Sequence, residues 1–378
     1  MTLEAARNQF PHLAQGLIYM NHATISPLPT AVRRAVDSYY EHRATKSIDL
    51  HPWVDDLALQ TKSKLARILH TKPERIAFTH NTADAVSILS SGIQWNDGDR
   101  VLLYKYEYPA NVYPYLLLKQ RGVEIDFVEP EDSRITLDII RRSVTPKTKL
   151  IALSLVQSVT GFQCDAQAIG KFCKERNIIF ALDAIQALPQ AEIDVEKANV
   201  DFMAVAVHKW LMGSEGTAPA YFSERLQKMI RQISMGTTSV ENPDSIFDYD
   251  VNRIRTDAGR YETGMLNYPG IAALNAALDF QEDFGFDEVR SRIHEHSAYL
   301  ISTLKSHGVS VLTPEAEHER SGIVTCEIEE PDKVNERLKK KNIIAKVVIA
   351  MGSRKLRFSP HFYNTEEELR LAMNTVFA

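Results

Sequence analysis

Short apolar runs recur along the first 222 residues, and the stretches between most of them have helical periodicity. The runs are continuous rather than alternating, which is typical of strands covered on both faces of a sheet. Seven runs predict strands, at 75–79, 100–104, 123–128, 150–155, 178–182, 202–206 and 219–222. Stretches such as 136–144 and 166–176 predict helices between them. This alternation predicts an α/β protein with a mostly parallel sheet.

The pattern changes after residue 240. The segment 240–260 is rich in Asp, Asn and Pro and has little periodicity, so we expect a long ordered loop. Helices are expected at 268–284 and 286–307. A smaller α+β unit should follow, with strands at 309–312, 322–328, 343–348 and 355–359 and a helix at 331–341. Thr365 and Glu368 have capping-box spacing, which predicts the start of a last helix.

The length of 378 residues suggests about two domains at ~100–200 residues each. We expect a large domain at 20–275 and a small domain formed by 1–19 together with 276–378. The small domain would then include the N-terminal strand and would not be contiguous in sequence.

Charge and composition exclude several classes of protein. Lys and Arg number 44 and Asp and Glu number 49, a net charge of −5, which gives no electrostatic footprint for nucleic acid. We expect no membrane span, because no apolar run approaches ~18 residues. The first residues carry charges and no apolar core, unlike a secretory signal, so a cytoplasmic protein is expected.

The motifs of several common sites are missing. The three cysteines are scattered and form no CxxC pair, which excludes a disulfide framework and a zinc ribbon. We expect no metal site. The chain also lacks GxGxxG after a strand and the P-loop pattern, so a nicotinamide-dependent oxidoreductase is a weak alternative.

Two strand ends carry candidate chemistry. The run 178–182 leads directly into Asp183, and ligands of open α/β sheets bind at the carboxyl ends of the strands. The run 202–206 is followed by His208 and Lys209, and burial frees a lysine amine to act as a nucleophile. Taken singly, Asp183 is equally explained as a helix cap, and Lys209 as a side chain that reaches out to solvent.

Together the two segments are more specific. Asp183-x-x-Gln186, followed about one βαβ unit later by His208-Lys209, resembles the signature of the class V aminotransferase family of pyridoxal-phosphate enzymes. Four further segments resemble the family's patterns, at 19–29, 79–85, 260–267 and 356–367. The resemblance therefore covers nearly the whole chain. It implies fold type I, with a seven-stranded large domain and a smaller α+β C-terminal domain.

The resemblance implies roles at the cofactor ring. Lys209 would hold pyridoxal 5′-phosphate as a Schiff base and later shuttle the proton at Cα. Asp183 would face the ring nitrogen, and Gln186 the phenolic oxygen. Tyr108 aligns with the family's ring-stacking residue, and this match in position favours stacking over the alternative of a core or rim aromatic after a strand. Lys209, Asp183 and Tyr108 are the predicted catalytic residues.

The phosphate should lie at a helix start. Asn81, Thr82 and Ala83 offer backbone N–H groups and a hydroxyl there, and His208 resembles a further contact on the phosphate side.

Substrate contacts are expected from four residues. Arg357 matches the family's arginine for the α-carboxylate of an amino acid, with a structural ion pair as the alternative. Asn21, His22 and Ser158 lie at positions near the family's substrate pocket. Asn21 could equally form a turn, and His22 could be a satisfied core residue.

The chain departs from the family's best-known members. Its segment 347–356 has no cysteine where the cysteine desulfurases carry a catalytic one, and Cys326 lies too far upstream. Tyr108 stands where those enzymes stack a His. Ala206 and Met265 replace hydroxyl residues near the phosphate, which puts two contacts in doubt.

These departures favour an aminotransferase or epimerase-like enzyme that acts at the α-carbon of an amino acid. One alternative is a lyase of the cysteine desulfurase or selenocysteine lyase type. Another is a protein that kept the fold and lost catalysis. The family fold implies a homodimer, in which the segment 240–267 would reach the partner's cofactor.

Overall fold

The computed structural model describes residues 1–46, 51–241, 247 and 249–378. Its centre is a seven-stranded sheet with the order β2-β8-β7-β6-β5-β3-β4. Only β8 runs antiparallel to its neighbours, so the sheet is mostly parallel, as predicted. The strands are β2 (Ile76–Thr79), β3 (Arg100–Tyr104), β4 (Glu124–Val128), β5 (Thr148–Ser154), β6 (Ile179–Asp183), β7 (Phe202–Ala204) and β8 (Ala218–Phe222).

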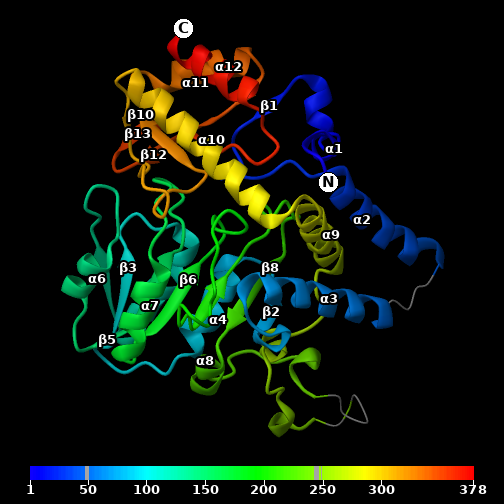
Figure 1. The fold of residues 1–378 in the computed structure, drawn as a ribbon. Helices are drawn as coiled ribbons and strands as arrows, with labels where there is room; N and C mark the ends of the chain where they lie inside the picture. The colour runs from blue at the N-terminus through cyan, green and yellow to red at the C-terminus, as the bar shows by residue number, and fades with distance from the viewer. Residues whose placement is uncertain (47–50, 242–246, 248) are drawn as a thin grey trace.

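Buried apolar side chains lie on both faces of this sheet, and Figure 1 shows the helices arranged around it. Along β3, Val101 and Leu103 belong to one buried cluster and Leu102 to another, because successive side chains point to opposite faces. The surrounding helices are α2 (Thr30–Glu41), α3 (His51–Leu69), α4 (Thr82–Gly92), α5 (Tyr113–Leu116), α6 (Leu137–Ser143), α7 (Ala166–Glu175), α8 (Glu224–Met229) and α9 (Tyr268–Phe284). The two-sided cover explains why the strands are continuous apolar runs.

The C-terminal part forms a smaller sheet with its own helices, which lies above the large sheet in Figure 1. Its antiparallel sheet has the order β12-β13-β10-β9. The strands are β9 (Ser310–Val311), β10 (Val324–Glu327), β12 (Lys346–Ala350) and β13 (Ser353–Phe358). The helices at this end of the molecule are α1 (Leu3–Arg7), α10 (Phe286–Ser306), α11 (Pro331–Lys340) and α12 (Glu366–Phe377). A third buried apolar cluster lies here and includes Leu300, Leu338 and Leu356.

The expected strand at 343–348 divides in two. β11 (Ile343–Ile344) pairs in parallel with β1 (Ile18–Tyr19), and β12 joins the antiparallel sheet. The N-terminal strand therefore does pair with the C-terminal part of the chain. α9 continues without a break across residues 275 and 276. The domain limits at 19/20 and 275/276 stay a prediction.

The last helix begins as the sequence predicts. Thr365 caps α12 by accepting a hydrogen bond from the Glu368 backbone N–H, and the Glu368 side chain accepts one from the Thr365 N–H. Within the predicted loop 240–260, residues 242–246 and 248 lie outside the described residues. The described part contains short 3-10 turns at Val251–Arg253 and Ala258–Tyr261.

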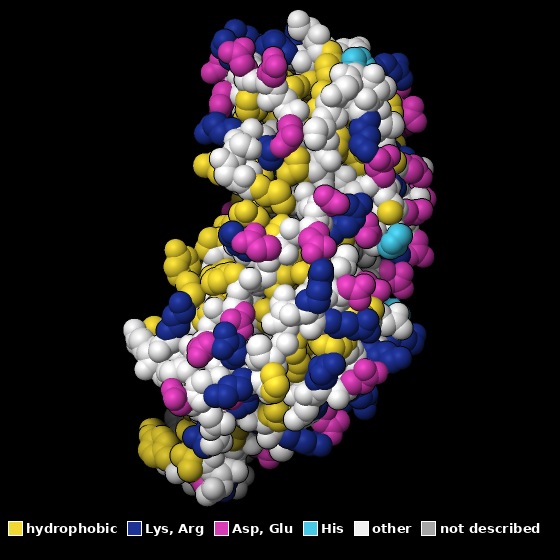
Figure 2. All heavy atoms as spheres, turned by 90° about the vertical axis from the view of Figure 1, so that its left-hand side faces the viewer, with side chains coloured by type: hydrophobic (Ala, Val, Ile, Leu, Met, Phe, Trp, Pro, Cys, Tyr) yellow, Lys and Arg dark blue, Asp and Glu magenta, His cyan; other side chains and the backbone are white. Residues whose placement is uncertain are grey.

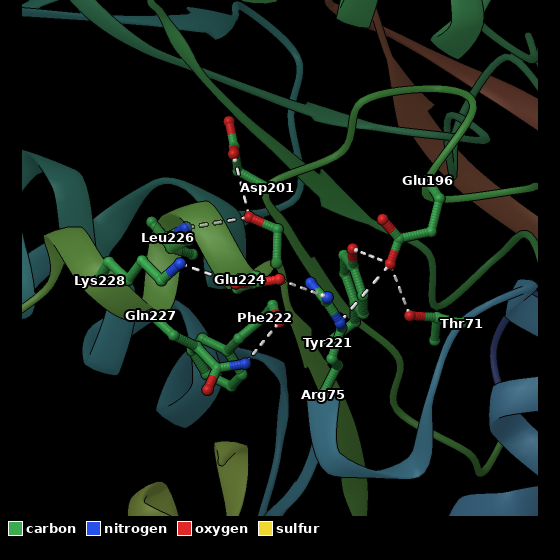
Figure 3. A network of polar contacts seen from close by, with 11 residues as sticks. Thr71, Arg75, Glu196, Asp201, Tyr221, Phe222, Glu224, Leu226, Gln227 and Lys228 are labelled. Carbon is green, nitrogen blue, oxygen red and sulfur yellow. Dashed lines mark hydrogen bonds and ion pairs between the residues drawn. The ribbon is translucent and has the colours of Figure 1, made fainter. Parts of the chain in front are cut away.

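Polar contacts tie the amino ends of the parallel strands to β8 and α8 (Figure 3). Glu196 accepts hydrogen bonds from Thr71 at 2.8 Å and from the Tyr221 hydroxyl at 3.2 Å. Arg75 pairs with Glu224 at 3.0 Å. This network lies at the edge of the sheet opposite Asp183, so the carboxyl edge is left for a site.

The space-filling view shows a waist between the two parts of the molecule, with hydrophobic side chains exposed along one edge (Figure 2). Among the helices that the structure describes, none combines the length and the apolar character needed to cross a membrane.

Candidate active site

A cavity of about 290 Å³ opens at the carboxyl edge of the large sheet. Its walls come from the segments that follow β1, β2, β3, β5, β6 and β7, and from β13 of the small sheet. Nine of the predicted residues line it: Asn81, Thr82, Ala83, Tyr108, Ser158, Gln186, His208, Lys209 and Arg357. The structure therefore brings together segments that are far apart in the sequence.

Lys209 lines this cavity, and its charge interacts with that of Asp183, which is buried and does not itself line the cavity. The Lys209 side chain follows β7, is only 6% exposed, and has its Nζ 5.4 Å from the centre of the Tyr108 ring. Burial lowers the pKa of Lys209, although the Asp183 carboxylate opposes this effect. A lowered pKa favours the neutral amine, which is the nucleophilic form.

Asp183 is the last residue of β6. Its Oδ1 accepts a hydrogen bond from the Ile185 N–H at 2.9 Å, and its buried Oδ2 has no partner among the described residues. Burial raises the pKa of Asp183, and the nearby Lys209 charge works against that rise. An unpartnered buried carboxylate oxygen is costly, and it suits a cationic N–H donor.

The start of α4 provides a polar wall. Asn81 caps the helix by accepting from the Asp84 N–H at 2.9 Å. The Thr82 hydroxyl is buried and makes no hydrogen bond within the described part of the chain. His208 is half-buried, and burial lowers its pKa, which favours the neutral imidazole. This wall offers donors to an anion at a helix N-terminus.

The amide of Gln186 has a fixed orientation. The Trp210 indole N–H can only donate, and it donates to Gln186 Oε1 at 2.7 Å. Gln186 Nε2 donates to the Ala23 carbonyl at 2.9 Å. The amide nitrogen carries a second hydrogen, and Gln186 lines the cavity, so it can present a donor there.

Arg357 lies on β13 and is 6% exposed. Its guanidinium donates to the Ser158 carbonyl at 2.7 Å and to the Thr24 hydroxyl at 2.8 Å. No acidic side chain of the described residues forms an ion pair with it, and its Nε is buried without a partner. Burial lowers the pKa of Arg357 to about 10. The alternative of a structural ion pair therefore finds no support among these residues.

Two of the predicted substrate residues lie behind the cavity wall. Asn21 accepts from the Thr24 hydroxyl at 2.8 Å, and Thr24 in turn accepts from Arg357. His22 is fully buried, with its ring nitrogens 2.9 Å from the Ser359 carbonyl and 2.8 Å from the Tyr363 hydroxyl. Neither residue lines the cavity. This arrangement matches the simpler explanations given for them above.

Sequence reasoning missed two polar residues here. Thr24 lines the cavity and connects Asn21 to Arg357. Glu107 precedes Tyr108, is only 8% exposed, and accepts hydrogen bonds from Ser154 and from the Tyr108 backbone. The only signal for Glu107 was a charged residue in the loop three residues after β3, a position that resembles an exposed surface site.

A comparison with models of known protein families shows to which family the chain belongs. The model of the family described as aminotransferase class-V matches residues 18–372. The chain belongs to this family. Class V aminotransferases are pyridoxal-phosphate enzymes, so the expected cofactor, the fold type and a cofactor-dependent class V enzyme are confirmed at the level of the family.

Proteins with similar sequences are named probable cysteine desulfurases, and those with similar folds include a cysteine desulfurase and the cystine C-S lyase C-DES. A probable cysteine desulfurase of Methanothermobacter thermautotrophicus is 25% identical over 81% of this chain and 76% of its own length. The apo cysteine desulfurase of Thermococcus onnurineus NA1 has a TM-score of 0.87 at 23% identity, covering 98% of this chain and 96% of its own. A lysine variant of C-DES, with glycine covalently linked to its pyridoxal-phosphate cofactor, has a TM-score of 0.88 at 22% identity and covers 98% of both chains.

The names of these relatives agree better with the lyase alternative than with the aminotransferase or epimerase-like interpretation that the sequence favoured. The missing cysteine in 347–356 therefore does not by itself exclude a lyase. A lyase name does not depend on one particular thiol, since carbon–sulfur cleavage also proceeds by direct departure of the sulfur group.

The donor set of this class V site fits pyridoxal phosphate. Asp183 Oδ2 and the Thr82 hydroxyl are buried polar atoms without partners in the described residues. They suit a protonated ring nitrogen and a phosphate, respectively. Lys209 supplies a buried amine in the same cavity, and Ala206 and the exposed Met265 add no hydroxyl, as the sequence indicated.

The three cysteines lie away from this site. Cys164, Cys173 and Cys326 are buried and unpaired, and none lines the cavity. Burial raises the pKa of each thiol to about 12. Such thiols are poor nucleophiles, because the thiolate is the reactive form. The segment 347–356, which has no cysteine, lies in the β12–β13 hairpin.

Proposed function

We propose that this protein is a pyridoxal-phosphate-dependent lyase that cleaves the Cβ–S bond of a sulfur-containing amino acid without an enzyme thiol. The choice of the Cβ–S bond is supported by the names of its relatives, which are probable cysteine desulfurases and the cystine C-S lyase C-DES. One observation carries the proposed mode of cleavage: the cavity has a buried lysine and no cysteine among its lining residues. The sulfur group would therefore leave directly from the substrate.

The cofactor, when bound to the substrate amine, supplies an electron sink that acidifies the Cα–H bond. Lys209 is proposed to hold the cofactor and then to take the Cα proton, because its pKa is lowered by burial. Asp183 would accept a hydrogen bond from the ring nitrogen and stabilise its positive charge. Gln186 would donate to the phenolic oxygen.

The remaining residues would bind the cofactor's phosphate and the substrate's α-carboxylate. Asn81, Thr82, Ala83 and His208 are proposed to surround the phosphate. Arg357 is proposed to bind the α-carboxylate, since its buried guanidinium lacks an acidic partner among the described residues. Ser158 and Thr24 would orient Arg357, and Asn21 would act through Thr24. His22 would support the wall from the core.

Cystine is the proposed substrate, because a protein of similar fold is the cystine C-S lyase C-DES in complex with its reaction product cysteine persulfide. Loss of the Cα proton and departure of the sulfur group give cysteine persulfide and an unsaturated amine. Water then converts that amine to pyruvate and ammonium, with no external oxidant or reductant. Tyr108 beside Lys209 would cover the ring face, although a phenol is a weaker acid than an imidazolium and is less suited to protonate the leaving group.

An aminotransferase or epimerase-like enzyme is the second candidate. It begins with the same Cα proton, and the exposed Tyr108 in place of an acidic imidazole favours it. A protein without catalysis is disfavoured, because a binder needs neither a buried amine nor a second buried charge at Asp183. The homodimer and the cytoplasmic location also remain proposals. Three unpaired cysteines agree with a reducing compartment.

The test compares amino acids on the cofactor-loaded protein. We expect pyruvate, ammonium and cysteine persulfide from cystine, and loss of all three in Lys209→Ala. A variant with Cys164→Ala, Cys173→Ala and Cys326→Ala should keep the activity. Conversion of the bound cofactor to its amine form by an amino acid would favour the aminotransferase instead. Alanine and sulfide formed from cysteine, abolished in the folded cysteine-free variant, would overturn the thiol-free mechanism.

A further inference from the structure

Glu107 is a buried charged residue with no part in the chemistry described so far. It follows β3, directly before Tyr108, and its side chain is almost fully enclosed. No lysine or arginine of the described residues pairs with it, and burial raises the pKa of its carboxyl group. Burying a carboxylate without a cation is costly, so a position that retains one calls for an explanation.

The contacts of Glu107 all bring donors to one carboxylate. Its Oε2 accepts from the Ser154 N–H at 2.7 Å, and its Oε1 accepts from the Ser154 hydroxyl. Oε1 also accepts from the Tyr108 N–H at 2.9 Å, and Gln157 contributes a further side-chain hydrogen bond. An amide could not replace this group, because its NH₂ would face another donor.

These contacts join Tyr108 to the strands that carry the site. Ser154 is the last residue of β5 and lies in register with Asp183, the last residue of β6. The Leu155 N–H donates to the Asp183 carbonyl at 2.9 Å, which fixes the same strand ends. Tyr108 itself caps a short 3-10 turn and is about half exposed, so few other contacts hold its ring.

From this geometry we infer that Glu107 is a positioning residue that holds Tyr108 over Lys209 by anchoring the loop after β3 to the end of β5. It touches neither the substrate nor the cofactor. Its effect on the reaction passes through the Tyr108 ring, whose centre lies 5.4 Å from Lys209 Nζ. Stacking of an aromatic ring is geometry-dependent, so a loosened loop weakens it.

The inference rests on the proposed function in one respect, the presence of pyridoxal phosphate in this cavity. The experiment is a double-mutant cycle on cofactor-loaded protein, with Glu107→Gln, Tyr108→Ala and the combination. The readouts are the rate of cofactor release and the visible circular dichroism of the bound cofactor. Glu129→Gln is the control, because Glu129 is exposed and pairs only with Lys105 among the described residues.

We expect each single variant to release the cofactor about tenfold faster and the double variant to be no faster than Tyr108→Ala alone. The role of Glu107 would be overturned if the double variant released the cofactor faster by the product of the two single-variant increases. A wild-type release rate for Glu107→Gln would overturn it as well. Should Glu107→Gln fail to fold, Ser154→Ala removes one of the same hydrogen bonds and completes the cycle. Wild-type protein that takes up no cofactor would overturn the proposed function as well.

Discussion

At the scale of single residues, three of the buried polar atoms without partners among the described residues belong to the candidate site. The Thr82 hydroxyl and Arg357 Nε come from residues that line the cavity, and Asp183 Oδ2 comes from a carboxylate that interacts with the cavity residue Lys209. Native proteins pair most buried polar groups, so these atoms cost stability in the cofactor-free protein. Sites of this kind often trade stability for binding.

Asp183 allows a direct test of that trade. Its raised pKa means that the folded state binds a proton more tightly than the unfolded state. Stability is therefore lost as the pH rises from about 4 toward the raised value. Asp183→Asn removes this loss. We expect the cofactor-free variant to be more stable than wild type by on the order of 1 kcal/mol or more at about pH 8.

The advantage should shrink at about pH 5, where Asp183 is protonated in the folded protein. The same substitution should weaken cofactor binding, because the amide cannot neutralise a ring cation. Thermal unfolding of cofactor-free protein at both pH values and a cofactor titration measure the two effects. A variant that loses stability at both pH values and binds cofactor normally would contradict the role of Asp183.

At the scale of elements, the turn that follows β5 of the large sheet packs against the small sheet. Gly161 lies at the end of this turn with φ +72°, and its N–H donates to the Gln157 carbonyl at 2.9 Å. A Cβ at this position would lie 2.3 Å from the Ile323 carbonyl oxygen, just before β10. The same turn carries the Ser158 carbonyl that binds Arg357.

Gly161→Ala should therefore displace the turn from Ile323 as well as strain the backbone. We expect a loss of about 2 kcal/mol or more in the free energy of unfolding. Weaker binding of amino acids should accompany it, measured as the shift in cofactor absorption on titration. Gly308→Ala is the matched control, with φ +76° and no atom near its added Cβ. It should cost about 1 kcal/mol and leave binding unchanged.

At the scale of the whole molecule, Arg357 from the small sheet reaches the wall formed by the large one. The cavity therefore depends on how the two parts are held together. The predicted homodimer would add a further wall. In the segment expected to reach the partner, Tyr249, Val251 and Met265 are exposed by 85%, 65% and 74%. Exposed apolar side chains of this kind are typical of interfaces.

A Tyr249→Asp and Met265→Glu double variant should shift the protein from dimer to monomer in sedimentation analysis, because a charge placed in an apolar interface has no partner. Cofactor retention should also fall, because the monomer lacks the wall that the partner would add to the cavity. Leu371→Glu, on the exposed face of α12, is the control and should stay dimeric. Wild-type protein that sediments as a fully active monomer would refute the dimer.

The sequence alone determined much of this protein. Apolar runs located all seven strands of the large sheet. The runs are continuous where the strands are buried on both faces, whereas the edge strand β4 alternates and is partly exposed. The resemblance of Asp183-x-x-Gln186 and His208-Lys209 to the class V signature indicated the cofactor, which the family match confirms. Local hydrogen bonding also fixed the start of α12 at Thr365.

Only the tertiary structure decided which side chains share the cavity. Hydrogen bonds between distant segments show that Thr24 and Glu107 support the site and that His22 belongs to the core. The split of 343–348 arose from pairing with β1, a partner more than 300 residues away. These outcomes depend on contacts across the fold, which neither periodicity nor local propensity encodes.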